Sequence, residues 1–183
     1  INRLDGLTIV TGTNSLRSGG DVYKVKKIIP HEGFSMSRMR HDIALVKVSQ
    51  PIKMSRLVRK INLPTTDTPG DQGAMLSGWG AYTFPQEKFP DKLQKLGLKT
   101  LSHDRCSSLS KQAGNDLPIY PDNICTITQA GKGACHGDSG GPLASSGVQI
   151  GVVSWGKPCA KGAPDVFARV YKYLDWINRN MRN

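Results

Sequence analysis

The stretch "GKGACHGDSGGPL", residues 131–143, decides how the rest of this chain is interpreted. It places a cysteine, a histidine, an aspartate and a serine among closely spaced glycines, and it ends in proline and leucine. Glycine at this density disfavours helix and strand interiors, because glycine loses the most conformational freedom on folding. The stretch therefore predicts a tight polar turn, and Ser139 in that turn is a candidate nucleophile.

The glycines around Ser139 also have a chemical use. They permit backbone angles that other residues resist, and they let a substrate carbonyl approach closely. The N–H groups of Gly137 and Ser139 can then point at one spot and hold an oxyanion. Because any glycine-rich turn can contain a serine without a function, the rest of the chain must decide between the two interpretations.

The composition indicates a globular, turn-rich protein. The 183 residues are 38% hydrophobic and 21% charged, enough for one large domain or two small ones. No apolar run approaches the ~18 residues of a membrane span, so we expect no membrane association. The net charge is +11, but the basic residues are scattered and no nucleic-acid motif accompanies them. We predict a solvated basic surface and no nucleic-acid partner.

Short apolar runs between turn signals predict a mostly β chain with two helices. Such runs are typical of a sandwich or a barrel, and the predicted strands span residues 7–13, 22–29, 43–49, 74–82, 93–101, 148–156 and 165–171. A first helix is predicted over 102–112 with Ser102 as its N-cap. A second, over 170–182, places its apolar side chains on one face, namely Val170, Tyr173, Leu174, Ile177 and Met181.

The four cysteines predict two disulfides in a secreted protein. They occupy positions 106, 125, 135 and 159, and none forms a C-x-x-C pair. Four cysteines allow three pairings, and their spacing does not choose among them. His103 and Cys106 alone are weak support for zinc, and no clustered acidic loop supports calcium. We expect no metal and no cofactor.

The stretch "GDSGGPL" (137–143) resembles the active-site signature of the chymotrypsin-like serine proteases. Asp42 and Ser139 lie 97 positions apart, near the ~93 of the family pattern. The match covers nearly the whole chain and is most similar to the digestive chymotrypsins of insects. Further family segments occur in the same order: "HDIALVKV" (41–48), "PIKMSRLVRKINLP" (51–64), "SGWG" (77–80), "VSWG" (153–156) and "PDVFARV" (164–170).

This resemblance implies an all-β fold of two six-stranded antiparallel Greek-key barrels with a C-terminal α-helix. Residues 1–62 would form a partial N-terminal barrel, and residues 63–183 the C-terminal barrel with the helix, together one peptidase domain. Residues 51–64 resemble the family's connector between the barrels, and the turn residues of 65–73 predict a linker between strands. The family pattern also implies the disulfides Cys106–Cys125 and Cys135–Cys159.

The resemblance implies a secreted, monomeric serine endopeptidase that acts through an acyl-enzyme. Ser139 would attack the scissile carbonyl, Asp42 would orient a histidine, and the N–H groups of Gly137 and Ser139 would form the oxyanion hole. Asp138 would pair with the new N-terminal ammonium after zymogen cleavage. Its partners would be polypeptide substrates and protein inhibitors of proteases.

The general base is missing from the chain. None of the four histidines lies in the family's "AAHC" motif; they are His31, His41, His103 and His136. His41 adjoins Asp42, but neighbouring strand side chains point to opposite faces. The family pattern puts the histidine about 45 positions before the aspartate, which falls just before residue 1. We therefore expect a longer natural protein, an inactive 183-residue chain, and a first barrel with only about half its strands. The alternative is a non-catalytic protease homologue that binds a partner.

The specificity pocket implied by the resemblance has an uncharged base. In trypsin-like enzymes the residue six positions before the nucleophile is an aspartate. Here that position is Gly133, and Ala134 follows it. Aromatic or large apolar side chains would fit. Asp165 departs from the family, which has a small residue on that wall, so broad or trypsin-like specificity is the alternative. His136 would line the rim, and an extended edge for the substrate backbone would come from Ser154, Trp155 and Gly156.

Overall fold

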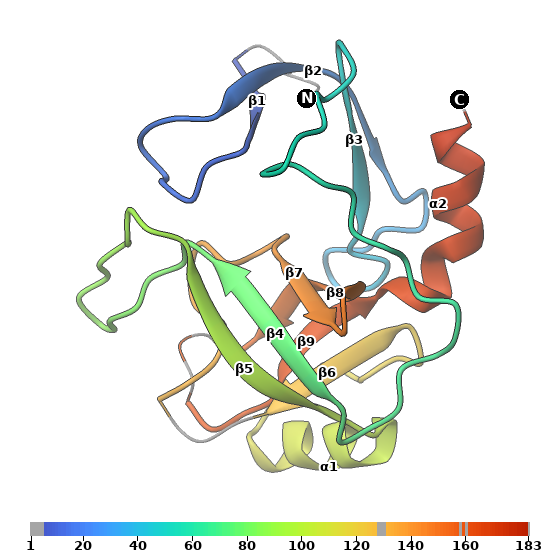
Figure 1. The fold of residues 1–183 in the computed structure, drawn as a ribbon. Coiled ribbons are helices and arrows are strands. Elements are labelled where there is room, and N and C mark those ends of the chain that lie inside the picture. The colour runs from blue at the N-terminus through green and yellow to red at the C-terminus, as the bar shows by residue number, and fades with distance from the viewer. Residues whose placement is uncertain (1–5, 128–130, 158, 160, 183) are drawn as a thin grey trace.

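The structure is a computed structural model that describes residues 6–127, 131–157, 159 and 161–182. Within these residues the chain forms two antiparallel β structures and a C-terminal helix that lies beside the first of them (Figure 1). The three-stranded sheet comes from the first part of the sequence and the closed barrel from the second. This confirms the mostly β architecture with one complete barrel, one partial sheet and a C-terminal helix.

The three-stranded sheet leaves apolar pairs exposed. Its strands β1 (Thr8–Thr11), β2 (Asp21–Pro30) and β3 (Ala44–Val48) pair in that order. Val10 pairs with Val22, and both are about half exposed, at 48% and 59%. Ile28 pairs with Val46, at 37% and 45%. These side chains therefore lack the cover that an apolar surface normally finds in a barrel.

The barrel is closed by six strands and has a dry core. Leu143 and Phe167 are completely buried in it, and Ile124 is 1% exposed. Alternate side chains of neighbouring strands fill the interior, as expected for a small barrel. In the order β4-β5-β6-β9-β8-β7, the strands are Gly73–Gly78, Gln94–Leu101, Asn123–Ile127, Asp165–Arg169, Val148–Gly156 and Pro142–Ser145.

Two of these strands, β6 and β7, were not predicted. Asn123–Ile127 is buried on both faces along most of its length, so it lacks the period-two alternation that identifies a strand. Pro142–Ser145 is short and begins with proline directly after the glycine turn. Strand 74–82 ends earlier than predicted, at Gly78.

Both helices form where they were predicted, with one correction. Helix α1 (His103–Gln112) is capped by Ser102, whose hydroxyl accepts a hydrogen bond from the Arg105 N–H. The C-terminal segment is a 3₁₀ turn, η1 (Val170–Tyr173), followed by α2 (Leu174–Met181). Met181 was predicted on the buried face but is 69% exposed, because it ends the helix beyond the last packed turn.

The C-terminal helix joins the two β structures. Trp176 and Ile177 of α2 pack in one cluster with Ile43 before β3 and Ala168 of β9. Figure 1 shows α2 running alongside β3, with the barrel below both. The cluster thereby fixes the segment that carries Asp42 against the barrel.

A disulfide and a buried arginine secure the outside of the barrel. Cys106–Cys125 ties α1 to β6 across 19 positions, a loop worth about 3 kcal/mol in the chain-entropy model. Arg169 is 8% exposed, and its guanidinium donates to Asp67 Oδ1 at 2.7 Å and to the Thr68 carbonyl at 2.9 Å. The connector that precedes β4 is therefore held on the barrel surface. None of the helices in the described ranges is long and apolar enough to cross a membrane.

A pair of leucine substitutions tests the barrel core. Leu143→Ala is expected to lower the free energy of unfolding by about 2–5 kcal/mol, because it empties a fully buried position. Leu57→Ala is the matched control at an 81% exposed position and is expected to change it by no more than about 0.5 kcal/mol. Denaturant titration measures both. Equal losses would contradict this placement of Leu143.

Candidate active site

Ser139 lies exposed on a tight turn between the 131–135 segment and β7. Gly137 and Gly140 take left-handed backbone angles, with φ of +93° and +78°, which residues with a side chain resist. The Gly140 N–H donates to the Val153 carbonyl at 2.9 Å, and the Gly141 N–H donates to the Asp138 carbonyl at 2.9 Å. The turn is thus bonded to itself and to β8, and it presents Ser139 at the surface.

Two backbone donors of this turn have no acceptor. Within the described part of the chain, the N–H groups of Gly137 and Ser139 make no hydrogen bond. Both residues are exposed, so a group that binds beside Ser139 can reach both donors. Two convergent N–H groups next to a nucleophile can stabilise a developing oxyanion.

The carboxylate of Asp138 points into the protein. Its Oδ1 accepts from the Gly80 N–H at 2.9 Å, and its Oδ2 accepts from the Cys135 N–H at 3.0 Å. It also lines the larger cavity of about 520 Å³ behind the turn, together with Gly78 and Gly133. No lysine, arginine or histidine of the described residues forms an ion pair with it.

A side-chain hydrogen bond joins Asp42 to the barrel. The Ser154 hydroxyl on β8 donates to Asp42 Oδ2 at 2.7 Å, although the two residues lie 112 positions apart. The sequence predicts Ser154 on the substrate edge and does not predict this contact. Nothing in the local sequence signals it, since the two strands meet only in the folded chain.

The described contacts of the four histidines are with groups other than Ser139 and the Asp42 carboxylate. His41 bonds Asp122, with its Nδ1 3.0 Å from Oδ2, and His31 stacks on His41. His136 bonds Glu87 on the β4–β5 connection, and His103 begins α1. In the described chain no hydrogen bond joins any histidine to Ser139 or to the Asp42 carboxylate. Glu87 is a neighbour of the site that the sequence did not indicate.

A smaller cavity of about 220 Å³ opens beside Ser139. Six of the seven residues predicted for the specificity pocket line it; these are Ala134, His136, Ser154, Trp155, Gly156 and Asp165. Gly133, the seventh, lines the larger cavity instead. Val153 of β8 completes the wall and was not predicted.

Asp165 is a buried acid in the wall of this cavity. It is 7% exposed, and its Oδ2 accepts from the Ala134 N–H at 2.9 Å. Burial raises the pKa of the Asp165 carboxyl to about 6, the Ala134 hydrogen bond opposes the rise, and the nearby negative charge of Asp138 adds to it. The Asp165 carboxyl is therefore neutral in acid and mostly ionised at and above neutral pH.

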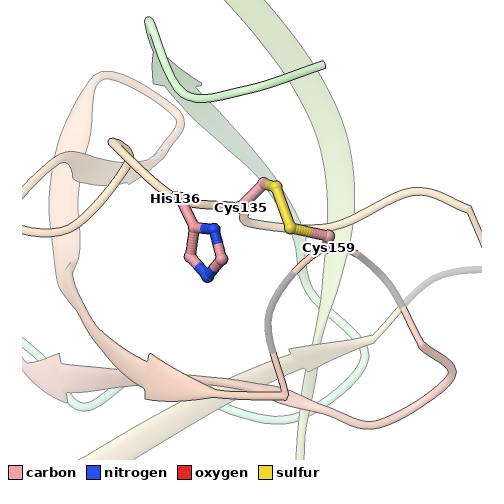
Figure 2. Close-up of side chains that lie close together, drawn as sticks. All are labelled: Cys135, His136 and Cys159. Atoms are coloured by element: carbon pink, nitrogen blue, oxygen red, sulfur yellow. A yellow bond between two sulfur atoms is a disulfide. The ribbon is translucent and has the colours of Figure 1, made fainter. Parts of the chain in front are cut away.

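The disulfide Cys135–Cys159 closes one side of the cavity region. Figure 2 shows both sulfur atoms bonded to each other and the His136 ring beside them. These three side chains lie close enough together to suggest a metal site. Because the disulfide consumes both thiols, the thiolate ligands that a metal needs are not present.

The comparisons with known proteins agree with this geometry. A profile of the Trypsin family matches residues 4–177. Chymotrypsin-2 of Vespa crabro is 39% identical over 176 residues, which are 95% of this chain and 77% of that protein. Trypsin delta of Drosophila erecta is 37% identical over 175 residues, which are 95% of this chain and 68% of that protein.

A solved structure shows the same fold. Neuropsin, a serine protease expressed in the limbic system of mouse brain, superposes with a TM-score of 0.87 and is 29% identical. The similarity covers 95% of this chain and 78% of the neuropsin chain. The family profile, the relatives and the shared fold all extend over nearly the whole sequence, and by them the chain belongs to the trypsin family of chymotrypsin-like serine proteases.

Proposed function

We propose that this protein contributes the nucleophile, the oxyanion hole and the specificity pocket of a serine endopeptidase. One observation carries the proposal: Ser139 stands on a glycine turn beside two unbonded N–H groups and at the mouth of a cavity. Residues 1–62 and 63–183 act as one peptidase domain, because the site draws Asp42 from the first part and Ser139 from the second.

In the proposed reaction the Ser139 hydroxyl oxygen attacks the scissile carbonyl carbon of a polypeptide. The carbonyl oxygen becomes an oxyanion and accepts hydrogen bonds from the N–H groups of Gly137 and Ser139. Collapse of the tetrahedral intermediate expels the amine and leaves an acyl-Ser139 ester, which water then hydrolyses.

A base must accept the hydroxyl proton of Ser139, and Asp42 would orient that base. A histidine between the two carries this role in the Ser-His-Asp triad, and no hydrogen bond in the described chain joins any of the four histidines to Ser139 or to the Asp42 carboxylate. We propose that the base comes from outside these 183 residues. The 183-residue chain is then expected to hydrolyse peptides negligibly.

External imidazole tests the nucleophile directly. The 183-residue chain is incubated with the p-nitrophenyl ester of an N-acylated phenylalanine, with and without imidazole as a substitute base. We expect an acyl adduct on the peptide that contains Ser139, at a rate at least about tenfold higher with imidazole. Intact-mass and peptide-mass spectrometry detect the adduct.

Two serine variants give the controls. Ser139→Ala is expected to abolish the adduct, whereas Ser108→Ala, at an exposed helix position, leaves it unchanged. An unmodified Ser139 under all conditions would favour the non-catalytic homologue. Efficient peptide hydrolysis without imidazole would show that another group of this chain serves as base.

The cavity supports a preference for aromatic or large apolar side chains. Its wall includes Ala134, Val153 and Trp155, and Gly156 leaves its mouth open. Asp165 adds one acid, bound to the backbone at the wall. We propose chymotrypsin-like specificity with a residual tolerance of arginine that increases as Asp165 ionises.

Small mimics of substrate side chains test this preference. Indole is expected to bind with an affinity that changes little between pH 5 and pH 8. Benzamidinium, cationic throughout, is expected to bind about tenfold more tightly at pH 8, because Asp165 with a pKa of about 6 is ionised there. NMR titration measures both.

The control is Asp165→Asn, which keeps an acceptor for the Ala134 N–H and removes the charge. It is expected to abolish the pH dependence of benzamidinium binding and to leave indole binding intact. Benzamidinium binding that exceeds indole binding at both pH values would contradict the proposed apolar preference and favour trypsin-like specificity.

Activation, location and partners follow as further parts of the proposal. The larger cavity gives Asp138 room to receive a chain-terminal ammonium after zymogen cleavage. Two disulfides fit a secreted protein. The open site suits polypeptide substrates and protein inhibitors that bind as substrates do, and we propose that the protein acts as a monomer.

A further inference from the structure

The backbone just before Asp42 adopts an uncommon conformation. His41 has a φ of +54°, in the left-handed region, which is strained for a residue with a side chain. The Ile43 N–H donates to the His41 carbonyl at 2.9 Å, so the chain makes a three-residue turn with Asp42 at its centre. Contacts of the His41 side chain must hold this turn in place.

Those contacts reach the other part of the molecule. His41 Nδ1 lies 3.0 Å from Asp122 Oδ2 and 3.2 Å from the Tyr173 hydroxyl, and this hydroxyl donates to Asp122 Oδ2 at 2.9 Å. Because the Tyr173 hydroxyl gives its one proton to Asp122 Oδ2, the His41 Nδ1–H is the donor to the same oxygen, and Asp122 Oδ1 has no hydrogen-bond partner among the described residues. Adjacent residues thus bridge to the barrel side at two points: His41 to Asp122, and Asp42 to Ser154.

We infer that His41 is a positioning residue for Asp42. In acid, protonation of the stacked His31 and His41 rings loosens the turn that His41 holds. The inference rests on the proposed role of Asp42 as the carboxylate that orients the base. It assigns His41 no contact with substrate: its part is to fix the turn that presents Asp42 to Ser154.

The stack explains the sensitivity to acid. The His31 and His41 rings lie 4.6 Å apart at an interplanar angle of 15°. His31 Nδ1 accepts from the Gly33 N–H at 3.0 Å, and a protonated imidazole has no acceptor. Protonation of His31 therefore breaks this hydrogen bond, and protonation of both rings places two positive charges face to face.

The remaining neighbours of the stack are aromatic or charged. His31 packs against Tyr173 and Trp176, at centroid distances of 5.5 and 5.1 Å. Trp176 donates to Glu32 Oε2 at 2.7 Å, and the Arg179 charge lies near Glu32. Arg40 lies over the Tyr120 ring, with its Nε 3.7 Å from Asp122 Oδ2.

These groups act on His41 in opposite directions. Burial is the largest effect and lowers the pKa of His41; Asp122 raises it, His31 and Arg40 lower it, and Glu32 raises it. Because the folded pKa lies below the unfolded value of ~6.5, the unfolded state binds the proton more readily. The contribution of His41 to stability is complete above the unfolded pKa of ~6.5, and it decreases as the pH falls from there toward the folded pKa of His41.

Carboxyl and imidazole NMR of the 183-residue protein test the inference without catalysis. Between pH 8 and pH 4.5, the side-chain carboxyl ¹³C signal of Asp42 is expected to shift in a step at the pH where His41 titrates. His41→Asn is expected to remove that step. His103→Asn, at an exposed histidine on α1, is the matched control and keeps it.

A second variant preserves the stack without its charge. His31→Phe is expected to move the His41-linked step to higher pH, because the repelling neighbour is gone. The inference is overturned if wild type lacks the step, if His41→Asn keeps it, or, where His41→Asn does not fold, if His31→Phe leaves it in place. If no acyl adduct forms on Ser139, the proposed peptidase function is wrong, but these NMR signals are unaffected. The two failures are therefore distinguishable.

Discussion

The inward-pointing carboxylate of Asp138 is the constraint on which the site depends. Its two backbone hydrogen bonds tie the serine turn to the end of β4 and to Cys135. A Cβ on Gly78 or Gly80 would fall 2.2 or 2.3 Å from the Asp138 side chain. Both glycines of "SGWG" are therefore required by the inward position of the aspartate of "GDSGG". Two motifs 60 residues apart are thereby one packing unit, and that unit exposes Ser139 with its neighbouring N–H groups.

A second constraint holds the two β structures together. The polar contacts that cross between them include Asp42 to Ser154 and His41 to Asp122, and Trp176 of α2 donates to Glu32. The apolar cluster around Ile43 and Ile177 lies among them. Because the site takes residues from both sides of this junction, any change that loosens it displaces Asp42 relative to Ser139 without touching either residue.

The sequence predicts the barrel and both helices, and it names six residues that line the cavity beside Ser139. What it misses has physical causes. Strand 123–127 is buried on both faces, so its side chains carry no alternating signal. Gly133 follows the family pattern into the pocket, yet in three dimensions it faces the neighbouring cavity. Asp165 stands out in the sequence as a departure, but its burial and its hydrogen bond to Ala134 are properties of the folded wall.

The sequence by itself determines the family, the serine turn and the β architecture, because glycine spacing, cysteine positions and apolar patterning are local properties of the chain. Only the tertiary structure decides which distant groups meet. It brings Ser154 to Asp42 and joins His31, His41 and Asp122 into one cluster. Such pairings depend on the register of strands and on the path of the C-terminal helix, and no local pattern encodes them.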